Sequence, residues 1–447
     1  MADFRLSPEE RALCGLIREA CVANHFSADR PRPGKKTSGI TGAPATVAAL
    51  VGRMEEKNRA DLNRYEGQDR ELVFFAFLFD IFNRFMDDFD RHILAQAASG
   101  DKILPVDFAN KAFAHFKKRG FSREDGARFF EIFFQLRRAH YFIEKQFAGK
   151  SPCMQKLRTS LWDTIFTHDP LFYKQHLIHR MNDFSMLITG ETGTGKYAAA
   201  SAIGMSGYIP FNEKSGSFSE SFTKTFVSIK LSRFPEALIE SELFGRKKGA
   251  VPEAINAYQG IFNACNRYGS ILLDEIDATP IHVQAKLLKV INERTFSPVG
   301  SHEQQRFSGR VIASTNKDLF ELRKKGLFRD DFYSRLCSDI LRMPTLAERI
   351  SENPAELENH IEHFIRNITG SLNTDLMQTV KKIIQEDPGI DYSWPGNMLE
   401  LEQHIRAIII NGTPLSEQMP PSTDAANTLV REMRKEDITA NDLLSRN

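Results

Sequence analysis

Apolar residues follow a helical period through the first third of the chain. Between about residues 47 and 147 they recur at steps of three and four, as on one face of an α-helix. The clearest run is Phe75, Leu78, Phe82, Phe85, Phe89 and Ile93, with charged residues between its members. This pattern predicts an all-α N-terminal domain over residues 1–146, with a flexible loop near 28–46, where Pro, Gly and Thr are frequent.

Phenylalanine is concentrated in the first 150 residues, which hold more than half of the chain's 35 Phe residues. The first interpretation is the core of a helical bundle. The second is a regulatory domain whose apolar face also packs on the rest of the chain or on a partner. Both remain open from the sequence.

The pattern changes after Ser151-Pro152, where short apolar strands begin to alternate with helices as far as Met343. Such alternation is typical of a parallel α/β sheet. Helices return over residues 346–412, including 357–368 and 376–385. We therefore expect an α/β subdomain over 147–345, a helical lid over 346–412, and a linker and C-terminal tail over 413–447.

The composition excludes some classes of protein but does not by itself indicate a function. Lys and Arg (59) nearly balance Asp and Glu (58), so no global basic field attracts nucleic acid. The five cysteines are scattered without metal-ligand spacing, which favours reduced thiols over disulfides or zinc. The N-terminus has no signal-peptide pattern, and the most apolar stretch, 72–82, is shorter than a membrane span. These features predict a cytoplasmic protein without a membrane segment.

A glycine-rich loop carries the clearest chemistry. The apolar strand 186–189 leads into Gly190-Glu191-Thr192-Gly193-Thr194-Gly195-Lys196, and a helix rich in alanine follows at 198–203. Glycines at this spacing let backbone N–H groups converge on phosphate oxygens, the helix N-terminus adds partial positive charge, and Lys196 reaches the β- and γ-phosphates. Tyr197 stands where a Mg²⁺-binding Ser or Thr usually follows the lysine. The loop predicts ATP binding.

Two further apolar strands end in polar residues suited to the same reaction. The strand 270–275 ends in Asp274, placed to hold Mg²⁺, and Glu275, placed to activate the attacking water. The strand 311–314 is followed by Thr315-Asn316, a pair that would sense the γ-phosphate or orient the water. Taken alone, the first strand end would indicate only exposed acidic residues, and the second only the polar residues that commonly end a strand. Because both occur together with the phosphate loop, the catalytic interpretation is the stronger one.

With these three strands in order, the chain resembles the AAA+ ATPase domain of the sigma-54-dependent transcriptional activators, the bacterial enhancer-binding proteins. The resemblance covers about residues 149–412. It rests on the phosphate loop and on further motifs in the family's order: Gly149-Lys150-Ser151-Pro152, Glu240-Ser241-Glu242-Leu243-Phe244-Gly245, Gln284-Ala285-Lys286-Leu287-Leu288, Phe328-Arg329-Asp330-Asp331-Phe332-Tyr333-Ser334-Arg335-Leu336 and Tyr392-Ser393-Trp394-Pro395-Gly396-Asn397.

The resemblance implies a fold and several roles. The fold is α/β, a P-loop AAA+ core with a parallel sheet and a helical lid. Arg329 and Arg335 would reach the γ-phosphate held by a neighbouring subunit, so hydrolysis would need a homo-oligomeric ring, expected to be a hexamer. A cation supplied in trans stabilises the charge that develops during phosphoryl transfer.

The chain departs from the family at four places. The loop that grips the sigma factor reads Gly249-Ala250-Val251-Pro252-Glu253-Ala254 here, without the family's Phe-Thr pair, and basic residues precede it at 246–248. Leu399 replaces a nucleotide-sensing arginine of the lid. Lys230 replaces the asparagine that restrains the catalytic glutamate, and an ammonium there would pair with Glu275 and hold it idle. Residues 430–447 offer one amphipathic helix at most, where the family has a DNA-binding helix-turn-helix, so direct DNA binding is not expected.

Three functions follow as hypotheses. The first is a sigma-54-activator-like regulator of transcription that couples ATP turnover to remodelling of its partner, with slow or conditional hydrolysis. The second is an AAA+ remodeller that acts on a different protein through the loop at 246–254. The third is an ATP-dependent scaffold that hardly hydrolyses the nucleotide.

Overall fold

The computed structural model describes residues 4–27, 43–248, 256–371, 373–389 and 392–413. The chain divides into two compact units, Met1–Thr345 and Leu346–Asn447, which we treat separately. The substituted loop at 249–254 and most of the expected tail lie outside the described residues. The four-part division expected from the sequence stays a proposal. Among the described residues, no helix is long and apolar enough to cross a membrane.

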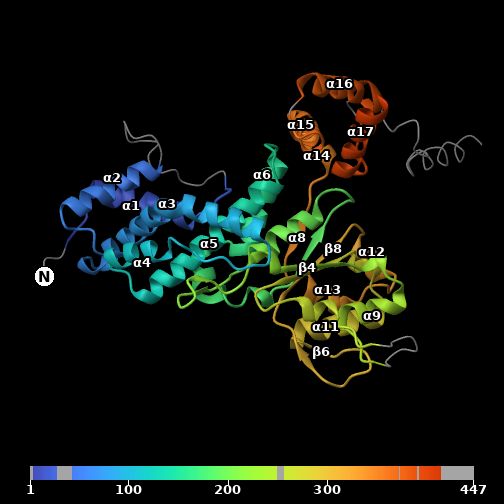
Figure 1. Ribbon diagram of the computed structural model, residues 1–447, viewed down its shortest axis with the longest axis horizontal. Helices are drawn as coiled ribbons and strands as arrows, with labels where there is room; N and C mark the ends of the chain where they lie inside the picture. The colour runs from blue at the N-terminus through green and yellow to red at the C-terminus, as the bar shows by residue number, and fades with distance from the viewer. Residues whose placement is uncertain (1–3, 28–42, 249–255, 372, 390–391, 414–447) are drawn as a thin grey trace, which may run out of the picture. The chain divides into compact units, whose positions relative to one another are not determined.

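The first unit begins with helices (Figure 1). Their bounds are α1 Pro8–Val22, α2 Ala43–Glu56, η1 Leu62–Arg64, α3 Gly67–Ser99, α4 Ala109–Lys118, α5 Arg123–Gln146, α6 Pro152–Phe166, α7 Pro170–Phe172, η2 Tyr173–Leu177 and η3 Met181–Asp183. Local sequence explains several starts: Ser7 and Ser122 accept hydrogen bonds from the backbone N–H three residues later, and prolines open α1, α6 and α7.

The expected helical period is confirmed on α3. Of the predicted run, Phe82 is partly buried and the other members are buried: Phe75, Leu78, Phe85, Phe89 and Ile93. The strands begin later than the change of pattern after Ser151-Pro152 suggests. Residues 152–183 contain only the helices α6, α7, η2 and η3 with their connections, and the first strand is the one expected at Met186–Thr189. Pro152 and Pro170 sit at the first positions of α6 and α7, where proline favours a helix rather than ending one.

A five-stranded parallel sheet forms the centre of the α/β part. Its order is β4-β5-β8-β1-β9, with β4 Phe226–Lys230, β5 Ser270–Asp274, β8 Arg310–Thr315, β1 Met186–Thr189 and β9 Ile340–Arg342. All side chains of β8 are buried, as in a sheet covered on both faces. Because the strands run in parallel, the residues that follow β1, β5 and β8 meet at one edge. This arrangement confirms the expected α/β P-loop core.

Short elements surround this sheet. The helices are α8 Lys196–Met205, η4 Phe222–Lys224, η5 Leu231–Arg233, α9 Glu236–Phe244, α10 Ile261–Ala264, η6 Ile276–Ala278, α11 Ile281–Glu293, α12 Leu319–Lys324 and α13 Asp330–Leu336. Two small antiparallel pairs join β2 Phe211–Asn212 to β3 Ser217–Phe218 and β6 Thr295–Phe296 to β7 Gln305–Arg306.

The N-terminal helices share one hydrophobic core with the sheet. This core runs from residues of α1 and α3 to Ile188 of β1, Ile312 of β8 and Ala199 of α8. Polar bonds reinforce the contact, since Arg138 of α5 donates to the carbonyl oxygens of Met205 and Gly207, each at 2.7 Å. The second interpretation of the phenylalanine pattern is therefore correct in part: the helices form their own core and also pack on the α/β part.

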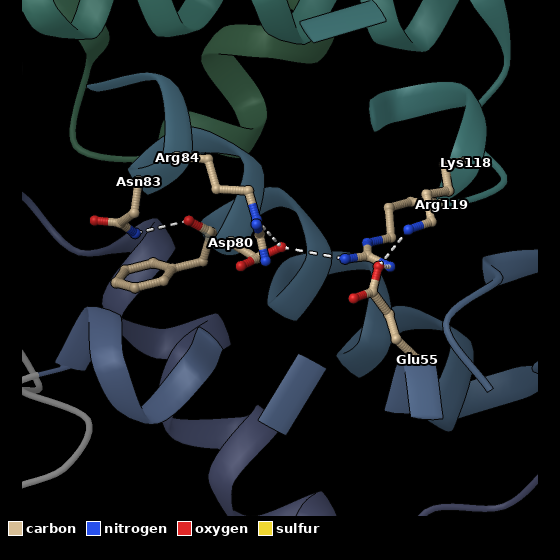
Figure 2. Close-up of polar contacts among 7 residues, drawn as sticks. Glu55, Asp80, Asn83, Arg84, Lys118 and Arg119 are labelled. Atoms are coloured by element: carbon tan, nitrogen blue, oxygen red, sulfur yellow. Dashed lines mark hydrogen bonds and ion pairs between the residues drawn. The ribbon is translucent and has the colours of Figure 1, made fainter. Parts of the chain in front are cut away.

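A network of ion pairs with two buried members, Arg119 and Asp80, lies among the N-terminal helices (Figure 2). Asp80 of α3 contacts Arg84 at 2.9 Å and Arg119 at 3.5 Å. Arg119 also contacts Glu55 of α2 at 2.8 Å, and Glu55 pairs with Lys118 at the same distance. The side chains of Arg119 and Asp80 are only 1% and 2% exposed. The network ties α2, α3 and the end of α4 together.

The second unit is a small helical bundle made of α14 Leu346–Glu352, α15 Ala355–Thr369, α16 Thr374–Ile384, η7 Gln385–Gly389 and α17 Asn397–Asn411. It has a hydrophobic core of its own, which includes Trp394 and Leu401. Asn397 accepts a hydrogen bond at 2.7 Å from the backbone N–H of Leu346 and so holds the first and last helices of the bundle together. Leu399 is half exposed on α17.

Candidate functional site

The phosphate loop joins β1 to α8, as the sequence predicts. Gly190, Gly193 and Gly195 all have positive φ, at 153°, 80° and 94°. A Cβ on Gly190 would lie 2.9 Å from the Cβ of Met343, so the close passage of the two backbones requires glycine there. Gly195 caps α8 in the left-handed conformation, and the helix begins at Lys196. The loop therefore ends at a helix N-terminus, which favours bound phosphate.

Hydrogen bonds within the loop fix its shape. The ammonium of Lys196 donates to the carbonyl oxygens of Gly190 and Glu191, each at 2.8 Å. The hydroxyl of Thr194, which is buried, donates to the same Glu191 carbonyl at 2.8 Å. Burial lowers the pKa of Lys196 below its ordinary value, although the charges of Asp274 and Glu275 act in the opposite direction.

Tyr197 occupies the position after the lysine and is 56% exposed. Its ring lies edge-on to Phe226, with the ring centroids 5.7 Å apart. This aromatic contact gives the side chain a packing role on α8. It differs in that respect from the small hydroxyl that usually stands at this position.

The two carboxylates expected at this edge lie at the end of β5. Asp274 closes β5 and accepts a hydrogen bond from the hydroxyl of Ser314 on β8. Glu275 follows in the left-handed backbone conformation, with φ 56°, an uncommon region for a residue other than glycine. Such outliers concentrate at functional sites, and this one turns Glu275 out of the strand.

Glu275 is held by the lysine that the sequence singled out. Lys230 ends β4, is paired in register with Asp274, and places its Nζ 2.7 Å from Oε1 of Glu275. Burial raises the pKa of Glu275, but hydrogen bonds from Lys230 and Ser232 and the charges of Lys230 and Lys196 outweigh it, so the pKa lies below its ordinary value. The predicted contact is present, and the glutamate is stabilised in its ionised form.

The two polar residues that end and follow β8 bind different partners. Asn316 is exposed and donates from its side-chain amide to the hydroxyl of Thr192 at 3.1 Å, which brings it beside the phosphate loop. Thr315 is buried instead and donates to Asp277 at 2.6 Å. Of the two, only Asn316 lies where it was expected to act.

Asp277 is a residue that the sequence reasoning missed. Its side chain is only 3% exposed, and Lys317 pairs with it at 2.9 Å. The signal was present, because a second carboxylate two residues after Glu275 continues the same acidic turn. Asp277 links the ends of β5 and β8 and so fixes the edge on which Asp274, Glu275 and Asn316 are carried.

The two arginines of α13 have different surroundings. Arg329 caps the helix and pairs with Asp331 at 2.7 Å, while its backbone N–H donates to the buried Gln284 of α11 at 2.9 Å. Arg335 is exposed, and its side chain has no hydrogen bond or ion pair to any described residue. No such contact joins either arginine to the phosphate loop across the described part of the chain.

The base of the substituted loop is well defined. Gly245 and Gly260 bring their backbones together, so that a Cβ on Gly245 would lie 2.6 Å from the carbonyl oxygen of Tyr258. Arg246 and Tyr258 exchange two backbone hydrogen bonds at 2.9 Å, and the Tyr258 hydroxyl donates to Glu242 at 2.8 Å. The strand-like pair at 246 and 258 thus joins the two described segments that flank the substituted loop.

Comparison with known proteins agrees with this geometry. The model of the family described as the Sigma-54 interaction domain matches residues 171–341, which contain the phosphate loop, the acidic strand and the α13 arginines. The chain carries a sigma-54 interaction domain. The AAA+ resemblance expected from the motifs is thereby confirmed for this domain.

Several relatives contain a similar domain. The regulatory protein AtoC of Escherichia coli (strain K12) is 36% identical over 279 residues, which cover 60% of this chain and 55% of AtoC. The DNA-binding transcriptional regulator NtrC of Azospirillum brasilense is 32% identical over 266 residues, 58% of this chain and 47% of NtrC. The chain spans about half the length of these curated relatives.

Among solved structures, NtrX from Brucella abortus in complex with ATP is similar with a TM-score of 0.45 and 20% identity. The match covers 73% of this chain and 71% of that chain.

Proposed function

We propose that this chain is an ATP-dependent regulator of the sigma-54 activator type, which assembles into a ring and couples ATP binding and hydrolysis to the remodelling of a protein partner. The observation that carries the proposal is the convergence of three strand ends. The phosphate loop after β1 lies in contact with Asn316, which follows β8. The charges of Asp274 and Glu275, at the end of β5, act to raise the pKa of Lys196 in this loop.

The residues present suit a nucleotide with Mg²⁺. Across the described residues no group of three His, Cys, Asp or Glu side chains is arranged to hold a metal alone. Mg²⁺ in such enzymes binds through one or two carboxylates together with substrate phosphates, which is the donor set that Asp274 offers. The ion would draw charge from the phosphates during transfer.

The chain's own residues would divide the remaining work. Gly190, Glu191, Thr192, Gly193, Thr194, Gly195 and Lys196 would hold the phosphates, with Tyr197 packed beside them. Glu275 would accept a proton from the attacking water, and Asn316 would orient that water or contact the γ-phosphate. Release of Glu275 from Lys230 would have to precede this step, so turnover would be slow until the ion pair opens.

Arg335 is the stronger candidate for the group that acts on a neighbouring subunit. Its side chain is exposed and unpaired among the described residues, whereas Asp331 neutralises Arg329. An arginine supplied in trans raises phosphoryl transfer rates by roughly 10³- to 10⁵-fold. The ring is expected to be a hexamer.

The first experiment measures nucleotide binding and turnover in the full chain. Wild type should bind ATP and hydrolyse it slowly, Lys196→Ala should lose binding, and Glu275→Gln should retain binding without turnover. Arg335→Ala should keep ATP affinity and lose turnover by more than Arg329→Ala does. Unchanged ATP binding in Lys196→Ala would refute the nucleotide site.

The partner is tested with Glu275→Gln loaded with ATP, since a stalled ATPase retains what it remodels. We expect capture of sigma-54 RNA polymerase, with Lys196→Ala as the control that cannot load nucleotide. The Lys230–Glu275 contact favours one rival, an ATP-dependent scaffold with little hydrolysis. If Glu275→Gln keeps full cellular function, that rival is correct; if it traps a protein other than the polymerase, the partner is a different one.

A further inference from the structure

A cavity lies within the N-terminal helices, away from the nucleotide site. Its volume is about 160 Å³, and it is walled mainly by aromatic and aliphatic side chains from α1, α3, α5 and α6 and the segment after α6. Phe79, Phe82, Phe133, Trp162 and Phe166 are among them. Exposed Leu171 stands on its lining and gives the cavity a side that faces solvent.

The size and lining suit a ligand with one apolar ring. An apolar cavity of about 150 Å³ in a protein stays dry and binds benzene. The apolar side chains that line this cavity should therefore bind an apolar ligand favourably. A packed interior ordinarily has few voids larger than a water molecule. A cavity of about 160 Å³ with a solvent-facing side is much larger than such a void.

One cation in the lining makes no ion pair with any described carboxylate. The ammonium of Lys174 lies 4.2 Å from the centroid of the Phe129 ring and 5.8 Å from that of Phe74. Burial lowers its pKa, although the charge of Asp125 acts in the opposite direction. Arg137 also lines the cavity, but Asp90 accepts two hydrogen bonds from it at 2.7 Å each. Lys174 is therefore the cation available to a ligand.

We propose that this cavity binds a small carboxylic acid with a one-ring apolar body, with the ring against the phenylalanine wall and the carboxylate on Lys174. The ligand would give the half-buried ammonium the direct carboxylate contact that no described residue supplies. Few, well-placed polar groups in an otherwise apolar pocket are typical of small-molecule sites. Binding itself does not depend on the function proposed above.

A short hydrogen-bonded path connects the cavity to the phosphate-loop helix. Tyr173 lines the cavity and donates its hydroxyl hydrogen to Gln135 of α5 at 2.9 Å. The amide of Gln135 donates in turn to the carbonyl oxygen of Ser206, the residue that caps α8, at 3.0 Å. A ligand that shifts Tyr173 would act on the end of the helix that starts at Lys196. This second step rests on the proposed function.

The test uses the full chain without nucleotide. Trp162 lines the cavity and the only other tryptophan, Trp394, lies in the second unit, so in the Trp394→Phe variant the emission reports the cavity alone. Benzoate is the probe, and benzyl alcohol is the neutral molecule of similar shape. We expect a saturable change in emission with benzoate.

Variants separate charge from shape. Lys174→Gln should weaken benzoate at least tenfold and leave benzyl alcohol unchanged, because the glutamine keeps part of the stem and removes the charge. Lys156→Gln, at an exposed position of α6 outside the cavity, is the matched control and should bind both as before. Ile132→Phe, which fills the cavity, should abolish both.

Two results would overturn the proposal: no saturable response to benzoate in a folded wild-type chain, or equal benzoate affinity in Lys174→Gln. Coupling is then measured as the ATP dissociation constant with and without saturating benzoate, where linkage requires the same factor in both directions. A benzoate site without such a factor would leave the cavity proposal standing and refute the path through Gln135. Absent ATP binding would instead refute the proposed function alone.

Discussion

Two ion pairs in this chain each join a basic side chain to a carboxylate, but one is buried and the other is partly exposed to solvent. Arg119 and Asp80 lie inside the N-terminal helices with 1% and 2% of their side chains exposed. Lys230 and Glu275 lie at the edge of the sheet with 38% and 25% exposed. A buried pair that loses one member leaves a charge without water, whereas a partly exposed pair can open at little cost because water replaces the partner.

The difference indicates what each pair does. The buried Arg119–Asp80 pair stands at the centre of a network that joins three helices, so it is part of the permanent frame (Figure 2). The Lys230 pair holds the residue proposed to activate water, and its exposure allows it to open and close. The stability of one region and the activity of the other should therefore respond separately to mutation.

The largest effect is expected from Arg119→Met. Removing the shared cation leaves Asp80 and Glu55 each with one cation, so we expect a loss near the lower end of the roughly 3–5 kcal/mol that breaking a buried pair costs. Urea unfolding followed by Trp162 emission in the Trp394→Phe background measures the first unit. The matched control, Arg91→Met, removes an exposed partner of Asp88 and should cost below ~0.5 kcal/mol.

A second substitution sharpens this result. Asp80→Leu added to Arg119→Met removes both buried charges, and it should recover part of the lost stability because an apolar replacement of a buried pair is often neutral. Arg84, 40% exposed, can then turn to water. A double variant less stable than Arg119→Met would show that Asp80 is held by more than its charge partners.

An intermediate effect is expected from Lys230→Asn. Freeing Glu275 should raise ATP turnover by up to about fivefold, the rate equivalent of about 1 kcal/mol, which is the upper end of what a partly exposed ion pair contributes. Steady-state hydrolysis at saturating ATP measures it, with Lys289→Asn on the exposed face of α11 as the matched control. Turnover equal to that of wild type would remove the idea that the ion pair restrains the glutamate.

How well the sequence predicted each region depends on whether a local sequence constraint determines its residues. The phosphate loop was found to the residue because phosphate binding dictates glycine and lysine spacing between β1 and α8. The Lys230–Glu275 contact was found because a family resemblance supplied the position. Arg119 and Asp80, 39 positions apart, gave no signal, since no local period links them. The cavity was not predicted from the sequence for a related reason. A phenylalanine-rich pattern indicates that a core exists, but it does not indicate where the packing of that core is incomplete.

The smallest effect is the pH dependence of the Glu275 pair. Its native pKa lies below its ordinary value of 4.5, so its contribution is present above that value and is lost as the pH falls through the lower native pKa. The stability difference between wild type and Lys230→Gln should be below ~1 kcal/mol near neutral pH and should vanish in acid. In a Glu275→Gln background the lysine substitution should have no such pH-dependent effect. A difference that survives there would assign the lysine's contribution to the charge of Asp274, its register partner on β5, and Glu275 would then be freer to act than the contact suggests.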